Sequence, residues 1–326
     1  MIDQFRKYTP LNIALLSVVG FVLCLGVFTH LPDNLMPVFF EPAISNFIGR
    51  LTPENISPET NVLITLVLTI VQALLLNRVV NKFNLTGRPG FLPALMYMTL
   101  ASLMLPFLVL SPILICNFLS IWMLDKLLSI YRRNEIKPLM VDLGMIIALG
   151  SLVYFPFVVM LLLVWSSLLI FRPFNWREWL SAPIGFASVY FLLGVTYLWL
   201  DRIDEFYEIW LPLTYPFPTS VRIDSYDYLV LLPVAAIMVL FVISLQQNLF
   251  KSVVHIRKSF LLLFCMFLLT AASFYLNAEW SVNHFLLAVP PIAIYMTFYF
   301  SYATTRWFYE SLFVLLLLTI VYFQFF

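Results

Sequence analysis

The chain has 326 residues, of which 62% are hydrophobic and 11% are charged. A soluble domain carries about 25% charged residues, and a soluble core of this size cannot enclose so much apolar surface. The net charge of +1 provides no basic surface for nucleic acid. The composition therefore predicts one integral membrane domain over residues 1–326, with membrane lipids as its surroundings.

Eleven apolar segments follow one another along the chain, each close to the length of a membrane-spanning helix. Such a helix needs about 20 apolar residues, and the backbone of a lipid-exposed segment must satisfy its own hydrogen bonds. The segments cover residues 11–29, 62–80, 91–109, 112–130, 139–154, 156–172, 180–200, 227–246, 259–276, 284–302 and 309–326. The pattern predicts an all-α, polytopic transmembrane bundle of about 11 helices.

Two prolines leave the helix count open between about 10 and 12. Pro112 and Pro156 each interrupt a long apolar run, and proline removes a helical donor and clashes with the preceding turn. Each site is either a tight hairpin or a kink in one long helix. Because each run is too long for a single crossing, hairpins are the favoured interpretation.

The basic residues indicate the orientation, because Lys and Arg stay on the cytoplasmic side of a membrane. Fifteen of the 18 Lys and Arg fall on the same side as the N-terminus, and the other three are Arg50, Arg202 and Arg222. We therefore expect a multi-pass membrane protein with a cytoplasmic N-terminus. The long connections 30–61 and 201–226 then lie outside, with apolar and aromatic segments that suit the membrane surface.

Candidate catalytic groups collect at the predicted outer face. His30, Asp33 and Glu41 follow the first helix, and His284 begins the tenth. Carboxylates and imidazoles serve as general acids or bases. The alternative interpretation is ordinary solvation of acidic loops. The three cysteines form no Cys-x-x-Cys pair, and the chain lacks phosphate-cradling and zinc-binding motifs, so we predict no metal and no cofactor.

Three polar residues lie within predicted helices: Gln72, Asn117 and Asp142. An ionisable group inside a membrane is a functional hypothesis by default, and here it would be a proton or ion relay. The alternative is structural. Gln72 and Asn117 would form hydrogen bonds between helices, and Asp142 would pair with Lys126 or Arg133.

The connection between the sixth and seventh helices, residues 172–179, has the composition of a membrane interface. It contains Arg172, Asn175, Trp176, Arg177 and Trp179. Aromatic rings anchor at the headgroup level, and Arg contacts lipid phosphate there. The segment is either a plain interfacial elbow or a site for a lipid or a protein partner.

The elbow also carries a resemblance. The sequence FRPFNWREWLSAPIGF, the preceding stretch from CNFLSIWMLDKLLSIYRRNEIKP to GSLVYF, and FRKYTPLN near the N-terminus resemble an uncharacterised family of Bacteroidota inner-membrane proteins. The resemblance implies a multi-pass protein of the bacterial inner membrane, of about this size, and no established activity. Some members bear a label of carotene oxygenase. That class binds iron with four histidines, and the three scattered histidines here cannot supply them.

The overall plan is similar to that of polytopic glycosyltransferases that use lipid-linked sugars. This similarity implies a role in envelope biogenesis at the periplasmic face, with Asp33 or Glu41 acting on the acceptor and a polyprenyl-linked sugar entering from the membrane. Two other hypotheses stay open. The protein is a non-enzymatic subunit of an inner-membrane secretion or assembly complex, or it is a lipid flippase or transporter. Whether it is an enzyme is left open by the sequence.

Overall fold

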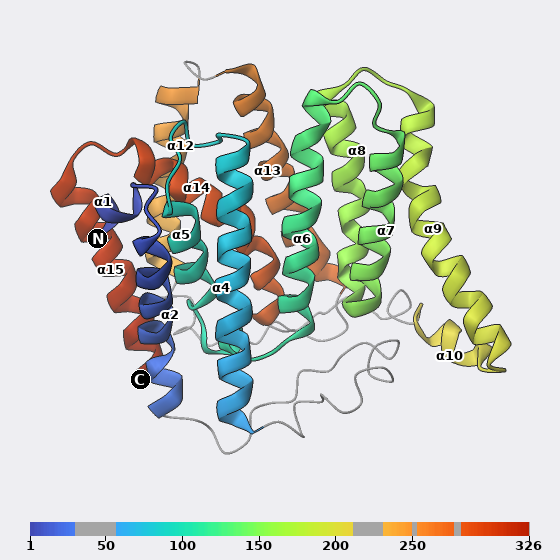
Figure 1. Cartoon of the computed structure of the whole chain (residues 1–326), viewed down its shortest axis with the longest axis horizontal. Coiled ribbons are helices and arrows are strands. Elements are labelled where there is room, and N and C mark those ends of the chain that lie inside the picture. The colour runs from blue at the N-terminus through green and yellow to red at the C-terminus, as the bar shows by residue number, and fades with distance from the viewer. Residues whose placement is uncertain (30–56, 211–230, 250–252, 277–281, 326) are drawn as a thin grey trace.

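The computed structural model of the protein describes residues 1–29, 57–210, 231–249, 253–276 and 282–325, and the regular structure within these ranges is helical (Figure 1). The longer helices are α2 (Leu11–Thr29), α4 (Pro58–Lys82), α5 (Leu92–Ala101), α6 (Pro112–Ser129), α7 (Lys137–Val153), α8 (Met160–Phe171), α9 (Trp176–Trp199), α12 (Leu231–Leu249), α13 (Val254–Ser273), α14 (Val289–Tyr302) and α15 (Arg306–Phe325). Two short helices are α1 (Ile2–Phe5) and α10 (Ile203–Glu208).

Each of the eleven predicted apolar segments overlaps one of the longer helices. Within the described residues, five helical stretches are long and apolar enough to cross a membrane on their own: Pro58–Lys82, Pro112–Ser129, Trp176–Trp199, Val254–Leu276 and Val282–Tyr302. Several other apolar helices are shorter. The two candidate hairpins are genuine breaks, because Ser111 caps α6 and a 3-10 turn, η4 (Phe155–Val159), separates α7 from α8.

Two helices depart from the predicted bounds for local reasons. The segment predicted over 91–109 is helical only to Ala101 and then continues as a 3-10 turn, η2 (Leu105–Leu108). Pro106 lies in that turn, where it cannot donate to a helical hydrogen bond. In contrast, α9 begins at Trp176, four residues before the predicted start at 180, because the side chain of Asn175 caps it. Hydropathy alone misses this polar first turn.

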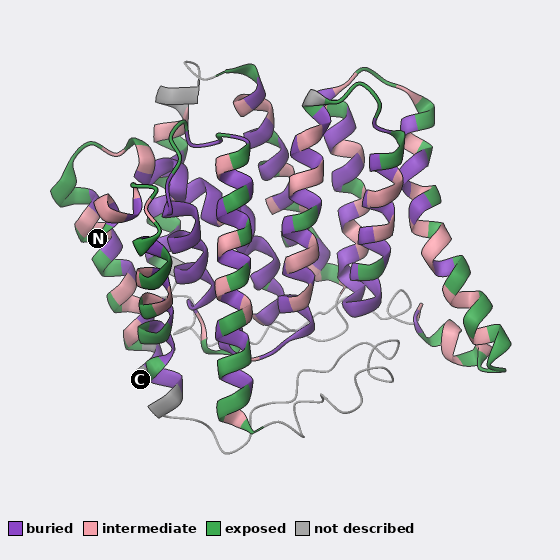
Figure 2. Ribbon diagram, in the orientation of Figure 1, coloured by how far each residue is buried: buried purple, intermediate pink, exposed green. Residues whose placement is uncertain are grey.

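The core of the bundle lies around α5 and α14. All ten residues of α5 are buried, and most of α14 is buried as well (Figure 2). Aromatic rings join α14 to its neighbours: the ring centroids of Phe241 and Tyr295 are 4.4 Å apart, and those of Phe260 and Phe298 are 4.8 Å apart. The more peripheral helices, such as α9 and α15, keep large apolar side chains on the outside, as a lipid environment permits.

Helix α9 packs on α7 through small residues. A Cβ added to Gly144 would overlap the Ala182 carbonyl, and one added to Gly185 would overlap the Val141 carbonyl. The two backbones therefore approach as closely as they do in small-residue contacts between membrane helices. Beyond this contact α9 leans away from the bundle, and α10 lies at its far end (Figure 1).

Candidate functional site

His284 is buried between helix ends, although it was predicted to belong to an outward-facing site. It lies in the 3-10 turn η7 (Val282–Ala288) and is 1% exposed. Its Nε2 lies 2.9 Å from the Thr270 carbonyl oxygen and 3.1 Å from Ser273 Oγ, and its Nδ1 lies 2.7 Å from Tyr154 Oη. Because a carbonyl only accepts, Nε2–H donates to Thr270, and Nδ1 accepts from the Tyr154 hydroxyl. Both ring nitrogens are thus engaged in linking η7, α13 and the end of α7.

The other three candidate catalytic residues, His30, Asp33 and Glu41, lie outside the residues that the structure describes. Their catalytic assignment stays a prediction. Across the described ranges, no group of three or more His, Cys, Asp and Glu side chains is arranged to hold a metal ion.

The two buried amides connect helices. Gln72 Nε2 donates to the Leu114 carbonyl at 2.6 Å, and Gln72 Oε1 accepts from the Tyr97 hydroxyl at 2.7 Å, which joins α4, α6 and α5. Asn117 Nδ2 donates to the Leu286 carbonyl at 3.0 Å, which joins α6 to η7. Gln72, Tyr97 and Asn117 are all fully buried. These contacts match the structural alternative stated for Gln72 and Asn117.

Asp142 forms an ion pair. Its carboxylate lies 2.7 Å from Lys126 Nζ and joins α7 to α6, which is the pairing that the sequence offered as an alternative to a relay. One residue earlier on α6, Asp125 accepts from Lys82 of α4 at 2.6 and 2.8 Å. Sequence analysis did not single out Asp125, because one carboxylate close to the basic end of an apolar helix gives no specific signal.

A groove runs between the last two turns of α4 and the C-terminal half of α6, and the Lys82–Asp125 ion pair lies at one end of it. Its volume is about 280 Å³, and its lining comprises Leu75, Arg78, Val79 and Lys82 of α4 and Phe118, Ile121, Trp122 and Asp125 of α6. Lys126 lies next to it, with its ammonium 5.6 Å from the centre of the Trp122 ring. This groove combines an apolar lining with three charged side chains, those of Arg78, Lys82 and Asp125.

The elbow at 172–179 divides into an inward and an outward half. Arg172 donates to the carbonyls of Arg133 and Asn134, so it ties the α8–α9 connection to the α6–α7 connection. Trp179 faces inward, with its ring stacked on Trp165 at 6.1 Å and its carbonyl accepting from Trp165 Nε1 at 3.2 Å.

The outward half of the elbow consists of Trp176 and Arg177. Both side chains are exposed, and the Arg177 guanidinium lies 5.6 Å from the centre of the Trp176 ring. Asn175 caps the helix between the two halves through its hydrogen bond from the Arg177 amide. Of the five predicted residues, only Trp176 and Arg177 therefore present side chains to a lipid or a partner, whereas Arg172, Asn175 and Trp179 have structural contacts.

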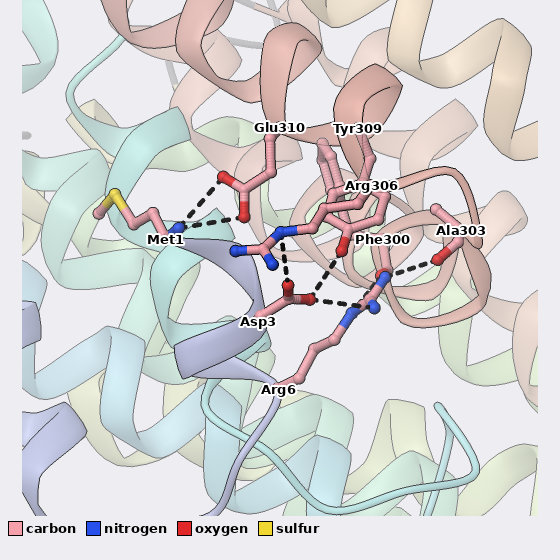
Figure 3. A network of polar contacts seen from close by, with 8 residues as sticks. All are labelled: Met1, Asp3, Arg6, Phe300, Ala303, Arg306, Tyr309 and Glu310. Carbon is pink, nitrogen blue, oxygen red and sulfur yellow. Dashed lines mark hydrogen bonds and ion pairs between the residues drawn. The ribbon is translucent and has the colours of Figure 1, made fainter.

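The N-terminal helix is fastened to the start of α15 by a polar network that sequence reasoning missed (Figure 3). Asp3 accepts from the Tyr309 hydroxyl at 2.7 Å and pairs with Arg306 at 3.2 Å and Arg6 at 3.3 Å. Arg6 also donates to the backbone carbonyl of Phe300, at 2.6 Å from Nη2. About 300 residues separate the partners in sequence, so no local pattern could indicate them.

The same network changes the acidity of Asp3. The hydrogen bond from Tyr309 is the largest effect, and together with the charges of Arg6 and Arg306 it outweighs the opposing effect of burial and holds the pKa of the Asp3 carboxyl below its ordinary value of 3.8. The N-terminal ammonium of Met1 also contributes to this lowering and pairs with Glu310 at 3.1 Å. Asp3 is thus held ionised at the centre of the network.

A comparison with protein families matches residues 47–326. The chain belongs to DUF6427, a family of unknown function. No curated protein and no solved structure matches the chain. Membership brings no activity with it, so the function has to be argued from the geometry described above.

Proposed function

We propose that this member of the DUF6427 family is an inner-membrane protein that crosses the bilayer eleven times, has a cytoplasmic N-terminus and serves envelope biogenesis as a non-enzymatic subunit of a membrane complex. The eleven apolar segments and the distribution of Lys and Arg support the crossings and the orientation. The proposed role is binding a partner within the membrane.

Helix α9 carries this proposal. Its first half is locked to α7 through Gly144 and Gly185, but only 22% of its apolar stretch is buried, the lowest fraction among the five long helices. Phe191 and Leu198 lie on one face, two turns apart, and are 70% and 63% exposed. A helix that leans out of a bundle with such a face offers a ready surface to a transmembrane helix of another subunit.

The polar chemistry of the described residues supports a binding role as well. His284, Gln72, Asn117 and Asp142 all have partners that join helices. Gln72, Asn117 and His284 are buried, and the partly exposed Asp142 is paired with Lys126. The transferase hypothesis depends on His30, Asp33 and Glu41, outside the described ranges, and it stays the alternative proposal.

Site-specific photocrosslinking tests the subunit role. A photoreactive amino acid replaces Phe191 or Leu198 in the full chain in native membranes, and Leu261, an exposed residue of α13, serves as the matched control. We expect a discrete protein adduct from positions 191 and 198 and none from 261. Adducts of the same kind from all three positions would contradict a specific docking face. Transfer of sugar from a polyprenyl-linked donor by the purified protein would replace the proposal with the transferase.

A further inference from the structure

The groove between α4 and α6 is built by one face of each helix. On α4 the lining residues are spaced at i, i+3, i+4 and i+7, from Leu75 to Lys82, and on α6 the same spacing runs from Phe118 to Asp125. This spacing places each set on a single helical face. The two faces open outward together, and both carry their charged residues toward the helix C-termini.

The charges in and around the groove are not balanced. Asp125 holds the ammonium of Lys82 at 2.6 Å, and Asp142 holds that of Lys126 at 2.7 Å. Arg78 is exposed and lines the groove, and within the described residues no carboxylate pairs with it. Its guanidinium is therefore the uncompensated cation of the site, with five N–H donors available to an anion.

The remainder of the groove is apolar. Leu75 and Phe118 each lie about two helical turns before the charged residue at the end of the groove, Lys82 or Asp125. Val79 and Ile121 are buried and form the floor. Trp122 stands at the rim and is about half exposed. Trp122 lies about two turns before the end of α6, with the Lys126 ammonium 5.6 Å from the centre of its ring. A tryptophan beside basic residues is typical of the headgroup level of a membrane. The ligand that fits both halves has an anionic head and a hydrocarbon chain.

We propose that this groove is a binding site for an anionic phospholipid. The Arg78 guanidinium holds the phosphate, which it pairs with in a bidentate manner, and an acyl chain lies along Leu75 and Phe118. Basic pockets between transmembrane helices on the cytoplasmic side bind such headgroups, and the orientation proposed above places the groove at that leaflet. The proposal does not depend on the subunit role, because it concerns a different face of the molecule.

Lipid binding by the full-length purified protein tests the site. Phosphatidylglycerol and phosphatidylcholine are titrated into the protein in neutral micelles, and bound lipid is measured by native mass spectrometry. Arg78→Gln is expected to weaken phosphatidylglycerol binding about tenfold, the effect of losing one charged hydrogen-bonded pair. Arg88→Gln, which removes an exposed arginine from the connection after α4, is the matched control and is expected to leave binding unchanged.

A second variant acts in the opposite direction. Asp125→Asn removes the carboxylate that holds Lys82 and so frees a second cation in the groove. We expect several-fold tighter binding of phosphatidylglycerol. If Asp125 and Arg78 served only to stabilise the helix pair, both variants would weaken binding together with thermal stability, and the proposal would be overturned.

Water-soluble glycerol phosphate separates the lipid from its headgroup. We expect it to compete at least a hundredfold more weakly than phosphatidylglycerol, because it lacks the chain that lies on Leu75 and Phe118. Equal affinity for the two would show a phosphate site without a lipid and would overturn the assignment. Equal losses in Arg78→Gln and Arg88→Gln would also overturn it, since they would show a general effect of surface charge.

Discussion

Single side chains hold together parts of this chain that are far apart in sequence. Asp3 is the clearest case, because three partners from two regions meet at one carboxylate. Gln72 plays a comparable role inside the bundle, where its amide contacts both α5 and α6. The sequence indicated that Gln72 would connect helices, but it could not name the partners, since a hydrogen bond depends on which backbone groups the fold brings near.

At the residue scale, the Asp3 network predicts a dependence on pH. The folded-state pKa of Asp3 lies below its ordinary value of 3.8, so its stabilising contribution is complete above that pH and is lost as the pH falls through the folded value. Asp3→Asn should lower the thermal midpoint at pH 7, and the difference from the wild type should shrink below about pH 4. Thermal unfolding from pH 3 to 7 measures this difference.

The control for this experiment is Asp204→Asn on α10, an exposed carboxylate outside the network. It should leave the midpoint close to that of the wild type across the whole range. A constant difference between Asp3→Asn and the wild type down to pH 3 would show that the ionisation of Asp3 contributes nothing to the folded state.

Two glycines allow helices α7 and α9 to pack against one another with their backbones in close contact. The α7–α9 contact depends on Gly144 and Gly185, at which a Cβ would come within 2.8 Å of the main-chain atoms of the facing helix. In lipid the hydrophobic effect does not drive helices together, so their positions depend on close van der Waals packing. The sequence predicted both helices but gave no sign that they face one another.

At the element scale, Gly185→Ala should therefore loosen the α7–α9 pair. The added methyl group meets backbone and not a flexible side chain, so the expected cost is about 1–3 kcal/mol of overpacking. Gly194→Ala is the matched control on the same helix, because its Cβ would lie at an ordinary 3.5 Å from the Phe206 ring. It should be neutral or stabilising by up to about 1 kcal/mol. Equilibrium unfolding in mixed micelles compares the two, and equal stabilities would refute the close contact.

At the scale of the whole molecule, the proposed topology places Asn134 and Asp204 on opposite sides of the membrane. Three helices, α7, α8 and α9, separate Asn134 from Asp204. Under the proposed orientation, Asp204→Cys should react with a membrane-impermeant maleimide in spheroplasts, and Asn134→Cys should react only after permeabilisation. The wild type sets the background, since its three cysteines lie in apolar helices. Labelling of both positions from the same side would rule out three crossings between them.

What the sequence determined by itself was the class and the order of the elements. A continuously apolar segment of membrane length forms a helix in lipid, because a helix satisfies the backbone hydrogen bonds within the segment itself. For that reason every one of the eleven predicted segments overlaps a helix. Helix ends set by capping, such as the start of α9 at Asn175, were less predictable because they depend on one side chain.

Only the tertiary structure decided which side chains meet. It enclosed His284 between helix ends instead of exposing it, and it paired Asp142 with Lys126. It also brought Arg78 of α4 beside Trp122 of α6 to form a groove that neither helix shows alone. Hydropathy indicates how each segment partitions between water and lipid. A site depends instead on how neighbouring helices face one another. Packing between residues far apart in the chain determines that arrangement.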